Sequence, residues 1–313
     1  VDRLTPGTPF GQVVLKDIGY AEPAQLTCDD EHHVLSTFAS RDIVPYHDSH
    51  RFSVCSVNNS GKVFCRLEMN HAAMDGASIS ILLRDLKSAC TKSFAEGARP
   101  EFKEFAKHAQ KQTSQESMKF WTSYLDGAQP CHIQLNPKGN NLANRSSIRT
   151  SRIELKDYSR LNSFCESANI TQSTVFNVAW GLLLAFLTQS DDVSFAYTTS
   201  LRDAPVEGID AMIGPVMNLN VCRIKLSAAG AGLSLFDVLQ KTQDDFAASL
   251  PHRACSLIDV LHEMKQGDKS LFNSGVSYRK LPPQTQTTGA DAVQFVQKGF
   301  IHDPAETAVY VNV

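Results

Sequence analysis

The sequence has no C-x-x-C pair, although eight of its 313 residues are cysteines. Cysteines at that spacing are the usual sign of a zinc site or a redox motif. The adjacent histidines His32 and His33 would point apart on a helix or a strand, and no other ligand stands at metal-binding spacing. We therefore predict no metal site. Because several cysteines lie in apolar patterns, we interpret them as buried thiols rather than as disulfides.

Long hydrophobic runs are also missing. The longest run, 175–187, is interrupted by Asn177 and Gly181 and falls short of the roughly 20 apolar residues that span a bilayer. The first residues do not have the basic and then apolar pattern of a signal peptide. We interpret the run as a buried helix, expect no membrane partner, and take a cytoplasmic location as the default.

Charge of one sign is not concentrated anywhere in the sequence. The 30 basic and 33 acidic residues are scattered and give a net charge of -3. No basic stripe is present to neutralise a nucleic-acid backbone, which argues against a nucleic-acid partner. The 42% of hydrophobic residues is ordinary globular usage. Since 313 residues exceed what one hydrophobic core usually supports, we expect two lobes.

Among the features that are present, alternating strands and helices predict a mixed α/β fold. The turn-rich segment 130–149 contains few apolar residues and is the predicted linker between an N-terminal lobe, 1–129, and a C-terminal lobe, 150–313. The predicted strands are 52–57, 63–69, 150–155, 193–198, 219–226, 272–278 and 309–313. The predicted helices are 79–89, a surface helix at 102–125, 158–168, 175–187, 236–250 and 256–264. The long loop 200–218 is of a length more often functional than idle.

His71 is predicted to lie where a strand is followed by a helix. Its imidazole is the side chain suited to taking and returning a proton near neutral pH. The first amides of the helix would offer N–H donors to a developing oxyanion. Asp75 would brace this segment by pairing with a distant arginine, and Gly76 would let the backbone turn while leaving its amide accessible. On spacing alone, a histidine before a helix is more often a hydrogen-bonded structural residue, and Asp75 could be only a helix cap, so both alternatives stay open.

The segment 70–76, Asn-His-Ala-Ala-Met-Asp-Gly, resembles the His-His-x-x-x-Asp-Gly motif of nonribosomal peptide synthetase condensation domains. Phe-Trp-Thr-Ser-Tyr-Leu-Asp-Gly at 120–127 resembles a second motif of that family. Further matches follow in family order at 192–195, 200–202, 205–209, 213–218, 271–274, 278–279 and 302–304. The late matches agree best with fungal members. The chain is thus identified, over nearly its whole length, as resembling a fungal condensation domain.

This resemblance implies two chloramphenicol-acetyltransferase-like lobes that form a V, with the active site at their junction. It implies that His71 is catalytic and that the amide of Gly76 faces the reaction centre. Asp75 is implied to be structural. Ser200 and Asn218 are implied to line the substrate tunnel.

The implied activity is amide-bond formation on a peptidyl or aminoacyl thioester. Peptidyl carrier domains would deliver the substrates on phosphopantetheine arms, and the chain itself would bind no cofactor. It would act as a monomer within a multidomain synthetase. Two alternatives are an acyltransferase of the same superfamily that uses acyl-coenzyme A, and a domain that binds carriers without catalysis. Against the first, the late Asp-Phe-Gly-Trp-Gly of plant-type members is absent.

Two departures from the family pattern limit the resemblance. Asn70 stands where the motif has its first histidine. Fungal terminal domains that cyclise and release peptides also replace that histidine, with serine, so extension and macrocyclising release both stay open. The sequence also starts downstream and ends upstream of the family's usual limits. We therefore expect 302–313 to begin a segment that latches one lobe onto the other, and the arginine partner of Asp75 to precede Val1.

Overall fold

The computed structural model describes residues 23–39, 50–69, 71–91, 93, 100–134, 150–228, 231–264, 270–280 and 307–313. The chain divides into two compact units, 1–73 and 74–313, each of which is described by itself. Asn70, most of the predicted linker and residues 302–306 lie outside the described residues. The predictions made for them, and the predicted lobe boundaries, remain predictions.

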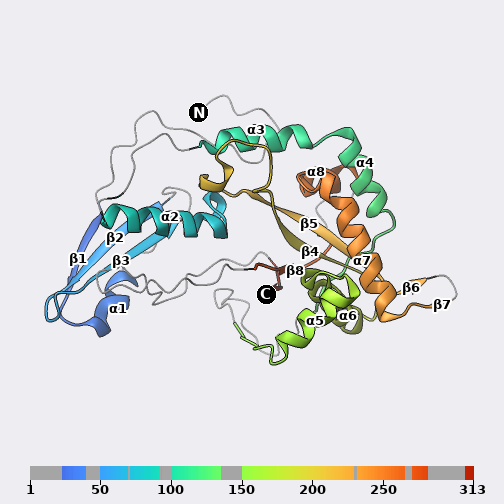
Figure 1. Ribbon diagram of the computed structural model, residues 1–313, viewed down its shortest axis with the longest axis horizontal. Coiled ribbons are helices and arrows are strands. Elements are labelled where there is room, and N and C mark those ends of the chain that lie inside the picture. The colour runs from blue at the N-terminus through green and yellow to red at the C-terminus, as the bar shows by residue number, and fades with distance from the viewer. Residues whose placement is uncertain are drawn as a thin grey trace. The chain divides into compact units, whose positions relative to one another are not determined.

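The first unit contains a three-stranded sheet in the order β1-β2-β3 (Figure 1). Its strands are β1 (Ala24–Cys28), β2 (His50–Val57) and β3 (Val63–Met69). β1 runs parallel to β2, and β2 pairs antiparallel with β3, with Ser56 opposite Val63. This confirms the predicted hairpin. A short 3₁₀ turn (Glu31–His33) and α1 (Val34–Ala39) follow β1, and Val34 and Phe38 pack with the buried Cys28, Cys55 and Val57.

The second unit is built on a four-stranded sheet in the order β5-β4-β8-β9. Its strands are β4 (Asp192–Ser200), β5 (Met217–Lys225), β8 (Ser274–Ser277) and β9 (Val309–Asn312), and a separate two-stranded sheet is formed by β6 (Ser227–Ala228) and β7 (Ala231–Gly232). β5 is antiparallel to β4, whereas β8 and β9 add in parallel. The predicted strands at 193–198, 219–226, 272–278 and 309–313 are confirmed.

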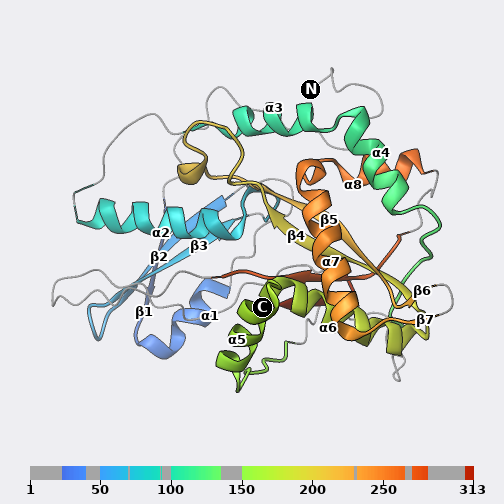
Figure 2. The same ribbon diagram turned by 45° about the vertical axis from the view of Figure 1, so that its right-hand side comes forward.

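Helices cover both faces of this sheet because residues along each strand alternate between the faces. The helices of the second unit are α2 (Gly76–Cys90), α3 (Phe102–Gln112), α4 (Gln115–Tyr124), α5 (Tyr158–Ala168), α6 (Gln172–Thr188), α7 (Leu235–Ser249) and α8 (Leu257–Glu263). Val193, Phe195 and Cys222 face α6 and α7, which lie side by side (Figure 2). Val221 instead joins a cluster with Trp121 of α4 and residues of α8. The mixed α/β class is confirmed.

Three local predictions were wrong. The segment 150–155 is not a strand, because no described strand pairs with it, and Ile153 is 90% exposed. The single helix predicted at 102–125 is two helices, since Ser114 accepts a hydrogen bond from the amide of Ser117 and starts α4 anew. The helix predicted to be buried, α6, is buried on one face only, and its Phe186 is 72% exposed.

None of the described helices is by itself long and apolar enough to cross a bilayer. Together α5 and α6 meet the length and composition criteria, but they bend by 105° at the break between them.

Candidate active site

The chain around His71 is a strand, a 3₁₀ turn and a helix. β3 ends at Met69, the 3₁₀ turn covers His71–Ala73, and α2 begins at Gly76. The predicted change from strand to helix is therefore confirmed. The side chains of Asn70 and His71 lie outside the described part of the structure, so their predicted roles remain predictions. The geometry that follows concerns the second unit, which begins at Met74.

α2 begins with a capping box formed by Asp75 and Ser78. Oδ1 of Asp75 accepts a hydrogen bond of 2.8 Å from the amide of Ser78, and the Ser78 hydroxyl accepts one of 3.4 Å from the amide of Asp75. The side chains thus satisfy amide groups that have no partner within the helix. An N-cap of this kind typically stabilises a helix by about 1 kcal/mol.

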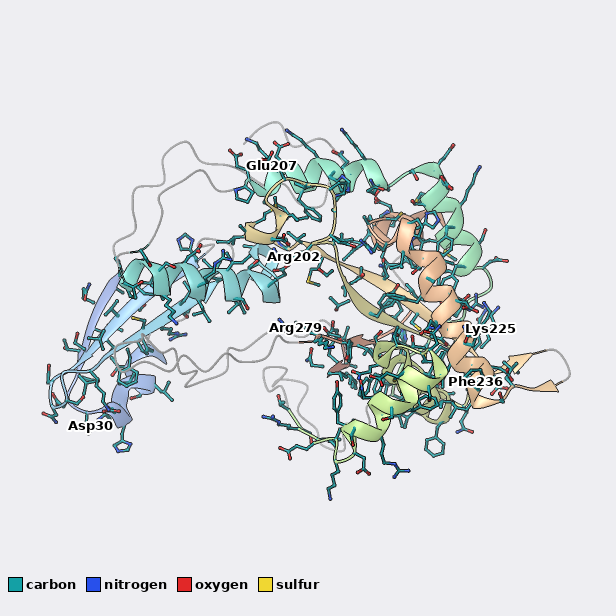
Figure 3. The ribbon with its side chains drawn as sticks, in the orientation of Figure 1. Asp30, Arg202, Glu207, Lys225, Phe236 and Arg279 are labelled. Atoms are coloured by element: carbon teal, nitrogen blue, oxygen red, sulfur yellow. The ribbon has the colours of Figure 1, made fainter. Side chains whose placement is uncertain are left out.

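The carboxylate of Asp75 also binds the guanidinium of Arg202, which lies just after β4 (Figure 3). Arg202 donates from Nη2 to Oδ1 at 2.8 Å and from Nε to Oδ2 at 3.1 Å. Its Nη1 donates to the backbone oxygens of Ile209 and Met212 at 3.0 and 3.1 Å. We expected the arginine partner to precede Val1, and this was wrong. The sequence did not reveal it because 127 residues separate the two members of the pair.

The same contacts determine the charge state of Asp75, which is 5% exposed. Burial on its own would raise its pKa. The hydrogen bonds from Arg202 and Ser78 together outweigh that effect and hold the pKa of the carboxyl below its ordinary value of 3.8. The ionised form is therefore the one that the fold stabilises, and its charge is balanced by Arg202.

Gly76 is the first residue of α2, and the structure gives a different reason for a glycine at this position from the one that we predicted. Its φ is not in the positive region occupied by Gly61, Gly127, Gly208 and Gly214, so the turn does not require a glycine there. A Cβ on Gly76 would instead lie 2.0 Å from Nη1 and 2.7 Å from Cζ of Arg279. The missing side chain gives room to the guanidinium of Arg279, which is labelled in Figure 3.

The long loop between β4 and β5 is packed against other elements. Leu201, Ile209, Met212 and Val216 form a buried cluster with Phe105 of α3. A 3₁₀ turn (Ile209–Ala211) lies within the loop. This packing and the arginine contacts hold the loop in a defined conformation next to the start of α2.

Ser200 and Asn218 lie at the two ends of that loop. Ser200 is the last residue of β4, is exposed, and accepts a hydrogen bond of 3.3 Å from the amide of Arg202. Asn218 pairs with Thr199 in the strand ladder. The side-chain nitrogen of Asn218 donates to two carbonyl oxygens at 2.8 Å, those of Arg253 and Cys255. Both of its N–H groups therefore have backbone partners.

The structure thus brings Asp75 and Arg202 into direct contact, and it places Gly76 beside Arg279 and Ser200 close to Arg202 in the chain. Sequence reasoning did not identify Ser78 or Gly214, which meet at this cap: the Ser78 hydroxyl bonds both backbone polar groups of Gly214. The one available signal was a serine three residues after Asp75, at the position where a capping box has its second polar side chain.

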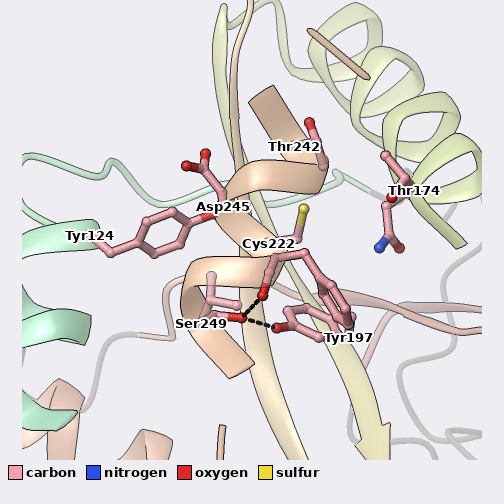
Figure 4. A pocket seen from close by; sticks show the side chains of 10 residues that line it. Tyr124, Thr174, Tyr197, Cys222, Thr242, Asp245 and Ser249 are labelled. Carbon is pink, nitrogen blue, oxygen red and sulfur yellow. Dashed lines mark hydrogen bonds between the residues drawn. The ribbon is translucent and has the colours of Figure 1, made fainter. Parts of the chain in front are cut away.

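A small cavity lies elsewhere in the second unit, among α4, α6, α7 and β5 (Figure 4). Tyr124, Tyr197, Cys222 and Ser249 are among the residues that line it, and the hydroxyls of Tyr197 and Ser249 lie 3.1 Å apart. Burial raises the pKa of Tyr197 to about 12. The volume of the cavity, about 10 Å³, matches one water molecule. It is too small for an acyl substrate, and no residue of the Asp75 cap lines it.

Within the described residues, no group of three or more His, Cys, Asp or Glu side chains is arranged to hold a metal ion. The cap at α2 contains one carboxylate, already paired with an arginine.

Solved structures share this fold. One is the first condensation domain of the calcium-dependent antibiotic synthetase in complex with a substrate analogue, with a TM-score of 0.63 and 15% identity over 88% of this chain and 64% of that one. Another is a four-domain nonribosomal peptide synthetase bound to AMP and glycine, with a TM-score of 0.65 and 20% identity over 84% of this chain and 21% of that one. This chain therefore has the chloramphenicol-acetyltransferase-like fold of condensation domains.

The sequence identifies the family. The family model described as Condensation domain matches residues 20–307, and the chain belongs to that family. It is similar to nonribosomal peptide synthetase 1 of Aspergillus fumigatus, with 43% identity over all of this chain, and to nonribosomal peptide synthetase nlsA of Emericella nidulans, with 36% identity over all of this chain. The chain spans 5% of the length of each. The family recognised from the sequence motifs is confirmed.

Proposed function

We propose that this chain catalyses amide-bond formation between carrier-bound substrates. The nitrogen of an amine attacks the carbonyl carbon of an acyl thioester, the C–N bond forms, and the C–S bond breaks. The amine loses a proton, the leaving sulfur gains one, and the products are an amide and a free thiol. No acyl-enzyme is required. Membership of the condensation domain family and the charged cap at α2 support this proposal.

We assign the proton transfer to His71, which deprotonates or positions the attacking amine. An imidazole suits this task because its pKa lies near neutrality. The amide of Gly76 would face the reacting carbonyl oxygen, at the end of a helix where N–H groups favour negative charge. Asp75 would act structurally through its bonds to Arg202 and Ser78.

The proposed partners are peptidyl carrier domains that present peptidyl or aminoacyl thioesters on phosphopantetheine arms. The arm belongs to the carrier, and no cofactor of the chain's own enters the reaction. Ser200 and Asn218 would line the substrate tunnel. For Asn218 this role would use its contact surface rather than its amide hydrogens, because those are bonded to two backbone carbonyls.

The observation that carries the proposal is the buried pair of Asp75 with Arg202. It fixes the helix start that follows the His71 segment, in a chain whose family uses that motif.

The test is His71→Ala in the natural polypeptide that contains this chain, with its carrier domains loaded. The loading uses a panel of N-acetylaminoacyl donors and aminoacyl acceptors, and the carrier-bound product is measured by intact-protein mass spectrometry. We expect product formation to fall by about 10²- to 10⁴-fold, the usual contribution of general acid–base catalysis. His33→Ala, at an exposed histidine of the first unit, is the matched control. Near-full turnover by His71→Ala would contradict the proposal.

The same assay separates the remaining alternatives. Carrier binding without turnover by the wild-type polypeptide would favour a non-catalytic domain, and faster reaction with acyl-coenzyme A would favour the other acyltransferase class. A cyclic product would assign macrocyclising release, which Asn70 leaves open, and a linear one would assign chain extension.

A further inference from the structure

Ser78 is fully buried, and its hydroxyl lies between the cap of α2 and the loop that joins β4 to β5. Its oxygen is 2.8 Å from Oδ1 of Asp75 and 3.1 Å from the carbonyl oxygen of Gly214. It accepts a hydrogen bond of 3.1 Å from the amide of Gly214, and Nη2 of Arg202 lies 3.3 Å away. A hydroxyl has one proton to donate and two lone pairs. Ser78 therefore uses its full capacity within this cluster.

Gly214 is confined from its other side by α3. A Cβ on Gly214 would lie 2.3 Å from Cδ2 of Phe102. The backbone of the loop thus lies between the ring of Phe102 and the hydroxyl of Ser78. Because both sides are packed, a shift of the loop is transmitted to the first turn of α2, and a shift of that turn is transmitted to the loop.

We propose that Ser78 is a positioning residue for the reaction. Its hydroxyl sets the first turn of α2, which carries the Gly76 amide, against the loop 201–216 that leads to Asn218. It acts through Asp75 and Gly214 and does not touch the substrate. The proposal rests on the proposed function, because only a reaction at this helix start makes the position of the turn matter for rate.

A second serine in the same unit has the same local chemistry away from this cap. Ser117 is also the third residue of its helix, α4, is 3% exposed, and donates its amide to the N-cap residue Ser114. Its hydroxyl lies 3.2 Å from the Ser114 oxygen and 3.1 Å from Nδ1 of His252. Ser117→Ala therefore removes an equally buried hydroxyl at the same helix position and is the matched control.

The experiment measures kcat and KM for amide formation in the natural polypeptide, with the same panel of loaded carriers. We expect Ser78→Ala to lower kcat by about 10- to 100-fold, as small misplacements of reacting groups do, while KM for the loaded acceptor carrier stays within about twofold. Ser117→Ala should lower the melting temperature similarly but leave kcat within about twofold. Amide hydrogen exchange across 209–216 should be faster in Ser78→Ala alone, and Ser78→Thr, which keeps the hydroxyl, should recover part of kcat.

Equal kcat values for Ser78→Ala and Ser117→Ala would overturn the proposal. If Ser78→Ala does not fold, Ser78→Cys takes its place, because it fills the same space with a weaker hydrogen-bonding group. We expect the same loss of kcat from it. If neither variant folds, Ser78 is a requirement of folding and the positioning role is also overturned. No product from the wild-type polypeptide with any loaded pair would contradict the proposed function itself, which distinguishes the two failures.

Discussion

Two arginines in the second unit bind their partners in the same way, yet one lies at the candidate site and the other in the scaffold. Arg202 and Arg223 each donate hydrogen bonds from Nε and Nη2 to an aspartate and from Nη1 to two backbone carbonyl oxygens. Arg202 binds Asp75 and the loop after β4. Arg223 binds Asp192 in the neighbouring strand and the end of α4 at Tyr124 and Asp126.

The two pairs differ in the exposure of the carboxylate and in what it does besides pairing. The Asp75 side chain is 6% exposed and caps α2, whereas that of Asp192 is 31% exposed at the start of β4. A buried carboxylate is held ionised only by its partners, while an exposed one is also held by water. The Arg202 guanidinium therefore keeps Asp75 ionised at the candidate site. The Arg223 guanidinium, in the same geometry, holds β4, β5 and the end of α4 together.

Replacing each arginine by methionine should separate the pairs most strongly. Arg202→Met leaves a buried carboxylate unpaired and should cost about 3 to 5 kcal/mol of unfolding free energy. Arg223→Met leaves a carboxylate that water can reach and should cost about 1 to 2 kcal/mol. Urea denaturation of the two variants measures the difference. Equal losses would show that exposure of the carboxylate does not set the cost.

Tyr124→Phe tests the hydrogen bonds that the scaffold makes with the backbone of Arg223. The Tyr124 hydroxyl accepts a hydrogen bond from the amide of Arg223 at 2.8 Å and donates to its carbonyl oxygen at 3.3 Å, at the edge of the sheet formed by β5. Losing it leaves two backbone groups without this partner and should cost about 1 to 2 kcal/mol. Thermal unfolding measures this loss, and turnover per folded molecule should be unchanged. A large loss of turnover would place the edge of β5 in the site.

The decrease of the unfolding free energy at acid pH tests whether Asp75 is ionised and paired in the folded protein. Because its folded pKa lies below 3.8, the ion pair contributes its full stability above the unfolded pKa and loses it as the pH falls through the folded pKa. Asp75→Asn cannot titrate, so its unfolding free energy should fall less steeply below about pH 4. Asp30 and Asp237 also have lowered pKa values and remain in both proteins. Parallel profiles would contradict an ionised, paired Asp75.

Gly76→Ala should have the smallest effect on stability. The added methyl meets the guanidinium of Arg279, the far end of a flexible side chain that can move away. Alanine also favours a helix over glycine by about 1 kcal/mol, so we expect a net change below about 1 kcal/mol in thermal unfolding. Turnover should still fall. In a chain that already carries Arg279→Ala, adding Gly76→Ala should lower turnover by a smaller factor. Additive losses would show that the two positions act independently.

The sequence predicted the elements better than the contacts between them. The hairpin, β4, β5, β8 and the change from β3 to α2 follow from local alternation, turn residues and helical period. The strand predicted at 150–155 failed because a strand needs a partner, which its own pattern does not specify. The cap residue Asp75 was identified from its motif, but its arginine partner was expected before Val1, since pairing with Arg202 across 127 residues leaves no local signal. The reason for Gly76 was missed similarly, because Arg279 is distant in sequence.

Turnover by Arg202→Met and Arg223→Met, each normalised to the folded fraction, shows whether the Asp75–Arg202 pair fixes the helix start at which we propose that amide formation occurs. If it does, the folded Arg223→Met protein forms product within about twofold of the wild-type rate, and folded Arg202→Met forms it about 10- to 100-fold more slowly. Equal rates per folded molecule for the two variants would contradict this role of the pair.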